Sequence, residues 1–308
     1  MIERVTVVGA GLVGQGWAIA FARAGVPVTV HDVTDLDRIR ENIARSVQGL
    51  AAEGLCEDPQ GLLGRLSFEA DLGKAVRDAD YIQESVFERI ETKRAISLEI
   101  DRAMRPDAIV GSSTSGFPGS SFTAECSHRN RFLVVHPVNP PHLIPLVEIV
   151  PAPWIDEDIP QTVRRFMEAI GQSPINLSRE IDGFVLNRLQ GALLDEAFAL
   201  LGEGYATAED IDKAVRDGLG FRWAFMGPFE TIDLNAPEGL KDYAERLAPM
   251  YARFAEQRKP DRRWTAEAIE TAHWQRRELL ASESLRTRQE WRDRMLARMK
   301  AFKSQNKL

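Results

Sequence analysis

A glycine-rich loop near the start of the chain restricts the possible folds more than any other feature of the sequence. An apolar run over residues 5–8 leads into three glycines spaced as G-x-G-x-x-G, and a helical run to residue 24 follows. In such a strand–loop–helix unit the glycines allow a tight turn, close approach of the backbone to a pyrophosphate, and close packing of helix on strand. We therefore predict a dinucleotide-binding loop. Its residues are Gly9, Gly11, Leu12, Val13 and Gly14.

The end of the second predicted strand identifies the dinucleotide. Asp32 stands there, about 20 residues after the loop, where a carboxylate can accept both ribose hydroxyls of the adenosine half. It would also repel a 2′-phosphate, so we predict NAD rather than NADP. A glycine-rich turn without a ligand is the alternative. The motif alone also fits FAD, although nothing in the chain would enclose an isoalloxazine ring.

The first half of the chain alternates short apolar runs with helical stretches, as in a parallel sheet covered on both faces. The predicted strands are residues 5–8, 28–31, 66–68, 81–84, 108–112, 132–136, 146–150 and 175–177. The predicted helices are residues 13–24, 35–52, 91–104 and 157–170. From about residue 183 only helical periodicity remains. We predict an α/β chain with a Rossmann-type doubly wound domain at 1–182 and a smaller all-α domain at 183–308.

Two helices of the second domain can be predicted in more detail. Thr207 precedes acidic residues and an apolar run that stops at Gly218, the pattern of a short capped helix. The stretch from Thr265 to about Lys303 has no proline and predicts one long helix. Its apolar face needs a partner, either its own domain or a second subunit. That face carries Trp291, Met295, Met299 and Phe302.

Composition excludes several classes of protein. No stretch approaches the ~20 apolar residues of a membrane span, and the first residues form no secretory signal, so we expect a cytoplasmic protein. Cys56 and Cys126 stand in no zinc-binding pattern, and no metal is predicted. The net charge of −7 argues against nucleic-acid binding, although residues 253–308 carry 15 basic and 8 acidic side chains. We interpret that basic segment as a solvated face or a subunit contact, with an anion-binding patch as the lesser alternative.

A histidine and a glutamate are the candidate reacting groups. His136 ends a predicted strand and is followed by Pro-Val-Asn-Pro-Pro, so it lies on the ligand side of a doubly wound sheet. Glu148 interrupts an apolar strand, where an unpaired buried carboxylate would cost several kcal/mol. If the two strands are neighbours, Glu148 can fix the tautomer of His136 and raise its basicity. The alternatives are a structural histidine and a solvated glutamate on an edge strand.

Hydroxyl and amide side chains near the same sheet edge are weaker candidates. Ser-Ser-Thr-Ser at 112–115 follows a strand and could donate to a substrate oxygen, although helix capping explains it equally well. Asn187 on the first helix of the second domain could reach the substrate, or simply flank a helix. No G-x-S-x-G elbow is present in the sequence, which argues against a serine hydrolase.

Together these motifs resemble the L-3-hydroxyacyl-CoA dehydrogenase family, and within it the L-gulonate 3-dehydrogenase branch that includes lambda-crystallin. The resemblance covers residues 5 to about 236. Besides the glycine loop it rests on the segments Ser-Ser-Thr-Ser at 112–115, His-Pro-Val-Asn-Pro-Pro at 136–141, Leu-Val-Glu at 146–148, Gly-Phe-Val-Leu-Asn-Arg-Leu at 183–189 and Gly-Leu-Gly-Phe-Arg-Trp-Ala-Phe-Met-Gly-Pro-Phe-Glu at 218–230.

The resemblance implies roles for individual residues. It makes His136 and Glu148 the catalytic pair, with Ser115 and Asn187 holding the substrate between the two domains. It also implies contacts near the cofactor and the substrate from residues that the motifs alone do not single out. These are Glu88, Lys93, Ser113 and Asn139.

The chain departs from the fatty-acyl members of the family at two points. Those members carry two aromatic residues after the catalytic histidine and no arginine at the position of Arg222, whereas this chain has Pro137 and Val138 and keeps the arginine. A guanidinium there could bind a free carboxylate bidentately. The alternative is that Arg222 pairs with an acid of its own helical domain.

The resemblance therefore implies an NAD-dependent 3-hydroxy acid dehydrogenase. It would oxidise the 3-hydroxyl of a small free acid such as L-gulonate, as a homodimer formed through the helical domain and without a nucleic acid or membrane partner. A 3-hydroxyacyl-CoA dehydrogenase such as a 3-hydroxybutyryl-CoA enzyme, a carnitine-type dehydrogenase or a diketone reductase are the alternatives within the enzyme class. A dinucleotide-binding structural protein of the crystallin type is the alternative outside it.

Overall fold

The computed structural model describes residues 2–257 and 264–306. The chain forms two compact units. The first holds the chain up to Asn187 together with residues 292–302, and the second holds residues 188–291 and those after 302. This division differs from the expected 1–182 and 183–308. The segment 183–187 is held by hydrogen bonds to the first unit, and residues 292–302 supply Ala297 to its core.

The first unit is built on a sheet whose described residues form eight strands in the order β3-β2-β1-β4-β5-β6-β7-β8. Neighbouring strands run parallel except β6 and β7, which pair antiparallel. The strands are β1 Val5–Val8, β2 Val28–His31, β3 Leu66–Glu69, β4 Tyr81–Glu84, β5 Ile109–Ser112, β6 Phe132–Pro137, β7 Leu146–Pro151 and β8 Ser173–Asn176. The doubly wound prediction is confirmed, and the strand order reverses between β1 and β4, where such folds bind ligands.

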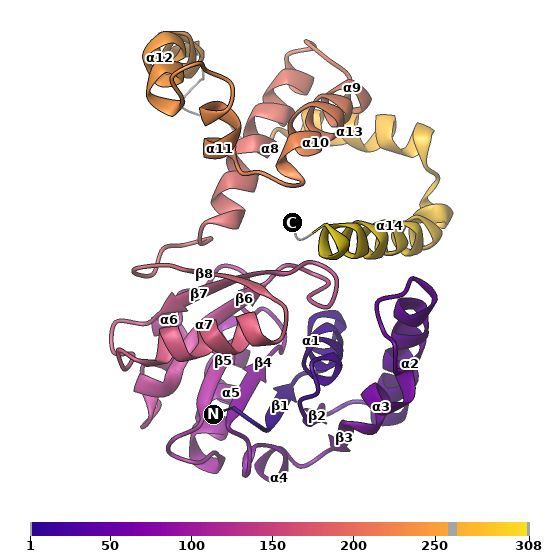
Figure 1. Cartoon of the computed structure of the whole chain (residues 1–308), viewed down its shortest axis with the longest axis vertical. Coiled ribbons are helices and arrows are strands. Elements are labelled where there is room, and N and C mark those ends of the chain that lie inside the picture. Colours follow the sequence, from indigo (N-terminus) through magenta and orange to yellow (C-terminus); the bar gives the residue numbers. More distant parts are fainter. Residues whose placement is uncertain (1, 258–263, 307–308) are drawn as a thin grey trace. The chain divides into compact units, whose positions relative to one another are not determined.

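Helices cover both faces of this sheet (Figure 1). One apolar cluster joins one face to α1, α2, α3 and α7, and a second joins the other face to α4 and α5. Tight packing follows from the small and apolar residues of α1, among which Trp17 and Phe21 are fully buried. The helices are α1 Leu12–Arg23, α2 Leu36–Ala52, α3 Pro59–Gly64, α4 Leu72–Val76, α5 Ile90–Ala103, α6 Ser120–Thr123 and α7 Ile159–Ala169.

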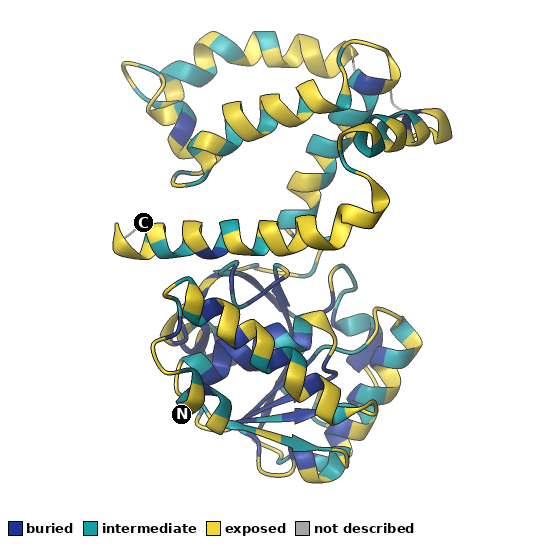
Figure 2. Cartoon of the chain, turned by 90° about the vertical axis from the view of Figure 1, so that its right-hand side faces the viewer, coloured by how far each residue is buried: buried dark blue, intermediate teal, exposed yellow. Residues whose placement is uncertain are grey.

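The described residues of the second unit form helices joined by short turns, with no strand among them. The predicted cap is confirmed, since the Thr207 side chain accepts from the backbone N–H of Asp210, and the helical path then continues through a π-helical turn over residues 214–219. Figure 2 shows that most residues of these helices are exposed or partly exposed. The helices are α8 Leu186–Gly202, α9 Ala208–Lys213, α10 Gly220–Trp223, α11 Pro228–Asp233, α12 Leu240–Gln257, α13 Ala266–Leu279 and α14 Leu285–Gln305.

The long helix predicted over 265–303 is wrong. The chain leaves the helix at Leu280, whose φ of −149° is extended, and a short 3-10 turn over Ser282–Ser284 leads into α14. The two serines of this turn compete for backbone hydrogen bonds, which weakens a helix interior without any proline. The break separates α13, in the second unit, from the half of α14 that belongs to the first.

Candidate active site

The glycine loop has the geometry of a pyrophosphate cradle. Gly9 has φ +90°, and a Cβ there would lie 2.7 Å from the Ser85 carbonyl. A Cβ on Gly14 would lie 1.9 Å from the Gly9 oxygen, so α1 approaches β1 as closely as only glycine permits, while a Cβ on Gly11 would meet open space. Gly11 caps α1 without a side-chain hydrogen bond, so the first backbone N–H groups of the helix suit an anionic ligand. The residues therefore fit a dinucleotide.

Asp32 lies beside this loop at the end of β2. Its carboxylate accepts from Ala10 N at 2.6 Å and from Thr34 N and Oγ1 at 2.8 and 2.7 Å. Burial alone would raise the pKa of this carboxyl, but these hydrogen bonds outweigh burial and hold the pKa below its ordinary value. Asp32 is thus a fixed, ionised acceptor at the end of β2, and its binding of the ribose hydroxyls stays a prediction.

Exposed apolar side chains surround the cradle. Leu12 is 78% exposed, Val33 directly after Asp32 is 91% exposed, and Phe87 after β4 is 84% exposed. Each follows the carboxyl end of a strand, the edge where doubly wound folds bind ligands. Leu12 was predicted from the sequence to contact the cofactor, whereas Val33 and Phe87 were not. Their place in the loops after β2 and β4 was the available signal.

His136 and Glu148 form a hydrogen-bonded pair. They are directly opposed in the antiparallel register of β6 and β7, and His136 Nδ1 lies 2.8 Å from Glu148 Oε2. His136 is 6% exposed and Glu148 is fully buried. The alternative of a solvated edge-strand glutamate is therefore excluded, because β8 covers the other edge of β7.

Two backbone donors hold the second oxygen of Glu148. Oε1 accepts from Val185 N at 2.8 Å and from Leu186 N at 3.0 Å, at the first residue of α8. Burial would raise the pKa of Glu148, but the bonds from His136, Leu186 and Val185 together lower it below its ordinary value. These two donors could not be predicted from the sequence, because backbone N–H groups have no residue signature.

The chain reaches this position through an unusual turn. Gly183 has a φ of +72° and Phe184 a φ of +53°. Among the described residues other than glycine, Phe184 alone has a positive φ. The Phe184 ring is fully buried and lies 5.5 Å from the His136 ring, centroid to centroid. The turn therefore both packs against the histidine and aims the N–H groups at its carboxylate partner.

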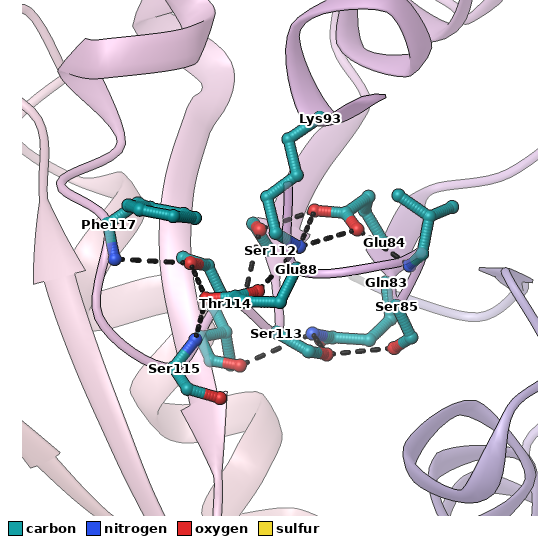
Figure 3. Close-up of polar contacts among 12 residues, drawn as sticks. Gln83, Glu84, Ser85, Glu88, Lys93, Ser112, Ser113, Thr114, Ser115 and Phe117 are labelled. Atoms are coloured by element: carbon teal, nitrogen blue, oxygen red, sulfur yellow. Dashed lines mark hydrogen bonds and ion pairs between the residues drawn. The ribbon is translucent and has the colours of Figure 1, made fainter. Parts of the chain in front are cut away.

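A second polar network lies at the ends of β4 and β5 (Figure 3). Lys93, which is 1% exposed, donates to both oxygens of the equally buried Glu84 at 3.0 and 3.2 Å and pairs with Glu88 at 3.3 Å. Ser112 also bonds to Glu84. Glu88 accepts from Thr114 Oγ1 at 2.7 Å and from Ser115 N at 2.8 Å. The network joins Lys93, predicted near the cofactor, to Ser115 through Glu88.

The predicted serines occupy different environments. Ser113 is buried, and its Oγ bonds to Trp17, Gln83 and Ser85. Ser115 is exposed, and its carbonyl accepts from Asn187 Nδ2 at 2.6 Å. The structure therefore brings Ser115 and Asn187 together, whereas the Ser113 hydroxyl is occupied by protein partners. Asn139 is exposed in the loop after β6.

Arg222 lies in the second unit, on α10. It is half-buried and makes no hydrogen bond or ion pair with any described residue. Among the described residues, 2–257 and 264–306, no acid supports the alternative that Arg222 pairs within its own domain. The nearby Arg216, in contrast, forms two bonds of 2.7 and 2.6 Å to Asp217.

The cysteines, possible metal ligands and possible membrane spans can each be checked in the described part of the chain. Cys56 and Cys126 are buried free thiols, and burial raises the pKa of Cys126 to about 12. Residues 2–257 and 264–306 hold no group of three metal-ligating side chains. None of the described helices combines the length and apolar character that a membrane crossing requires.

Comparison with protein families gives two matches that together cover most of the chain. Residues 4–181 match the model described as 3-hydroxyacyl-CoA dehydrogenase, NAD binding domain. Residues 183–279 match the model described as 3-hydroxyacyl-CoA dehydrogenase, C-terminal domain.

Individual proteins show the same similarity. Lambda-crystallin of Oryctolagus cuniculus is 37% identical over 98% of this chain and 96% of its own length. L-carnitine dehydrogenase of Bacillus cereus is 39% identical over 80% of this chain and 76% of its own length. Among solved structures, the NAD+-dependent 5-formyl-3-hydroxy-2-methylpyridine 4-carboxylic acid 5-dehydrogenase superimposes with a TM-score of 0.74 at 29% identity, covering 92% of this chain and 98% of that one.

Proposed function

The chain belongs to the 3-hydroxyacyl-CoA dehydrogenase family and is an NAD-dependent oxidoreductase acting on CH–OH groups, and we propose that its substrate is a small free 3-hydroxy acid of the L-gulonate type. The cradle at Gly9 to Gly14 and the ionised Asp32 hold the dinucleotide. When bound, NAD accepts the hydride that leaves the substrate carbon.

His136 serves as the general base. Its Nδ1 is engaged by Glu148 at 2.8 Å, so Nε2 is the nitrogen that takes the hydroxyl proton as the C–H bond breaks and the carbonyl forms. Glu148 stabilises the imidazolium. Its second oxygen accepts hydrogen bonds from the backbone N–H groups of residues 185 and 186. Without those donors the buried carboxylate would accept the proton itself more readily.

Ser115 and Asn187 position the substrate oxygens. The 2.6 Å bond from Asn187 Nδ2 to the Ser115 carbonyl fixes the Asn187 side chain against the backbone of Ser115. The bonds that Glu88 accepts from Thr114 Oγ1 and from Ser115 N fix the loop that carries Ser115. We assign Glu88 and Lys93 the supporting role of holding this loop, because Lys93 is 1% exposed and fully engaged by two carboxylates.

The free-acid assignment rests on one observation, the unpaired Arg222. A half-buried guanidinium without an acidic partner among the described residues is costly unless a ligand supplies the anion. A free carboxylate can bind it bidentately, and a thioester cannot return that interaction. A similar structure belongs to a dehydrogenase named for a carboxylic acid, which is consistent with this class of substrate.

A substrate panel tests the proposal. L-Gulonate, 3-hydroxybutyrate, L-carnitine and 3-hydroxybutyryl-CoA would be compared by NADH formation at 340 nm under one set of conditions. We expect the highest kcat/KM with a free hydroxy acid. A preference for the CoA thioester would reject the free-acid assignment. NADH binding without turnover of any of these compounds would favour a structural, crystallin-like role instead.

We also propose that the helical unit forms a homodimer contact. It exposes several large apolar side chains, and such side chains grouped on a surface mark protein–protein contacts. Light scattering coupled to size exclusion would give the mass of the dimer, and a mass of one chain would reject this part of the proposal. The most exposed of these side chains are Tyr205, Phe221, Phe229, Leu234 and Trp274.

A further inference from the structure

Three basic side chains gather where α14 packs against the first unit, away from the candidate active site. Arg23 ends α1, His142 lies in the loop between β6 and β7, and Lys300 lies on α14. All three are half-buried. Because α1 rises about 1.5 Å per residue, Arg23 stands about 18 Å along the helix from the cradle at Gly11. The guanidinium end of the cluster therefore stands at the opposite end of α1 from the dinucleotide site.

Direct contacts fix the position of the cluster. Lys300 Nζ donates to the His142 carbonyl at 3.1 Å. Ala297, one turn earlier on α14, is buried in the same core cluster as α1. His142 lies against α1, because a Cβ built on Gly16 would be 3.2 Å from its Nδ1. Gly16 and Arg23 lie two turns apart on one face of α1.

The cluster lacks a negative partner within the described part of the chain. Arg23 makes no hydrogen bond or ion pair with any described residue, and Glu53, the residue after α2, pairs with Arg298 at 3.0 Å. His142 Nδ1 is buried without a hydrogen-bond partner. Cys56, which raises the pKa of Arg23 electrostatically, is a buried thiol.

The pKa values of these groups show that they lie close together. Burial first and Arg23 second lower the pKa of Lys300 to about 8. Burial, then Arg23 and Lys300, lower the pKa of His142 to about 4. Lys300 and His142 thus both feel the charge of Arg23.

We propose that Arg23, His142 and Lys300 form a binding site for a small oxyanion of the phosphate type. The guanidinium offers a planar pair of donors, the ammonium a point charge, and His142 Nδ1 a further donor when it carries the ring proton. Residue 142 and α14 come from distant parts of the chain, so the bound anion joins them to α1. The anion thereby fastens residues 292–302 to the NAD-binding unit.

Phosphate titration tests this site. Thermal unfolding of the whole protein would be followed with increasing inorganic phosphate at constant ionic strength, with saturating NADH so that the pyrophosphate cradle is filled. We expect phosphate to raise the melting temperature of the wild type, because a ligand of the folded state stabilises it. Arg23→Met and Lys300→Met should each weaken the apparent phosphate affinity by at least about tenfold. Arg298→Met, on the same helix but paired with Glu53, should respond like the wild type.

The outcomes separate cleanly. No phosphate response in the wild type, or equal responses in all variants, would overturn the proposal. If succinate stabilises and phosphate does not, the phosphate-type assignment is wrong. Should the Arg23 and Lys300 variants fold poorly, hydrogen exchange of the wild type decides. Slower exchange over 292–302 on adding phosphate supports the site, and unchanged exchange there rejects it.

Discussion

His136 and Glu148 occupy directly opposed positions in the antiparallel pair of β6 and β7, with 2.8 Å between Nδ1 and Oε2. Opposed residues of an antiparallel pair share one face of the sheet, so the strand register itself brings the two side chains together. A shift of one residue in either strand would send one of them to the other face. The pair is thus specified by the same hydrogen bonds that hold the sheet.

The first prediction concerns the base. His136→Gln should lower kcat by about 10²–10⁴-fold, because the variant cannot take the hydroxyl proton. NADH binding, measured by fluorescence titration, should stay nearly unchanged. His128→Gln is the matched control, since His128 also bonds to a buried carboxylate, Asp101, at 2.9 Å, but lies at another place in the fold. Equal losses in both variants would argue against the assigned base.

The second prediction concerns Glu148. A glutamine has one acceptor oxygen, so Glu148→Gln cannot serve both His136 and the donors at 185 and 186, and leaving them unsatisfied costs about 1–3 kcal/mol. The variant should lose kcat and stability together. The exposed Glu168→Gln is the control, and unchanged kinetics in Glu148→Gln would refute the paired base.

The contribution of Glu148 to stability depends on pH because folding lowers the pKa of its carboxyl. Above the ordinary value of 4.5 the carboxyl is ionised in both states, so the contribution is complete. As pH falls below 4.5 the unfolded chain takes up the proton first, and the contribution is lost once pH has fallen through the lower folded pKa. The difference in melting temperature between wild type and Glu148→Gln should be constant above pH 4.5 and shrink below it. A difference that grows in acid would contradict the sign.

The third prediction concerns the choice of dinucleotide. Asp32→Ser should lower the preference for NAD, measured as kcat/KM with NAD divided by kcat/KM with NADP, by at least about tenfold. The reason is that the repulsion of a 2′-phosphate by a carboxylate costs several kcal/mol. Asp35→Ser removes a neighbouring charge but keeps an N-cap on α2, so its ratio should match the wild type. A wild type that already favours NADP would contradict the prediction.

The fourth prediction concerns Arg222. Arg222→Met should raise KM for a free hydroxy acid about 10- to 100-fold, the loss expected for charge-assisted hydrogen bonds to a carboxylate, and leave any activity on a CoA thioester little changed. Arg216→Met removes an arginine that is already paired with Asp217 and serves as the control. Equal losses on both substrates would show that Arg222 acts through the fold.

Sequence patterns predicted the sheet well and the short helices poorly. All eight predicted strands are present in the described chain, because buried parallel strands read as uninterrupted apolar runs. The helices α3 and α4 were missed, since each is too short for periodicity. Their N-caps Asp58 and Asp71 accept from backbone N–H groups three residues on and were the available signal.

The parts of the candidate site that consist of side chains could be predicted from the sequence. The parts that consist of backbone N–H groups could not. His136, Glu148 and Asp32 stand at strand positions that the pattern exposes. The donors at Val185 and Leu186 depend on the positive φ of Phe184, which no residue type announces. The burial of Lys93 depends on Glu84 and Ser112, which come from strands far apart in sequence.

The first turn of α8 ties the local fold to the chemistry of the site. The backbone N–H of Leu186, the first residue of α8, donates to Glu148, and the N–H of Val185 just before the helix donates to the same oxygen. Fraying of this turn would take both donors from a fully buried carboxylate and so raise the pKa of Glu148. The start of one helix and the basicity of His136 therefore depend on the same two hydrogen bonds.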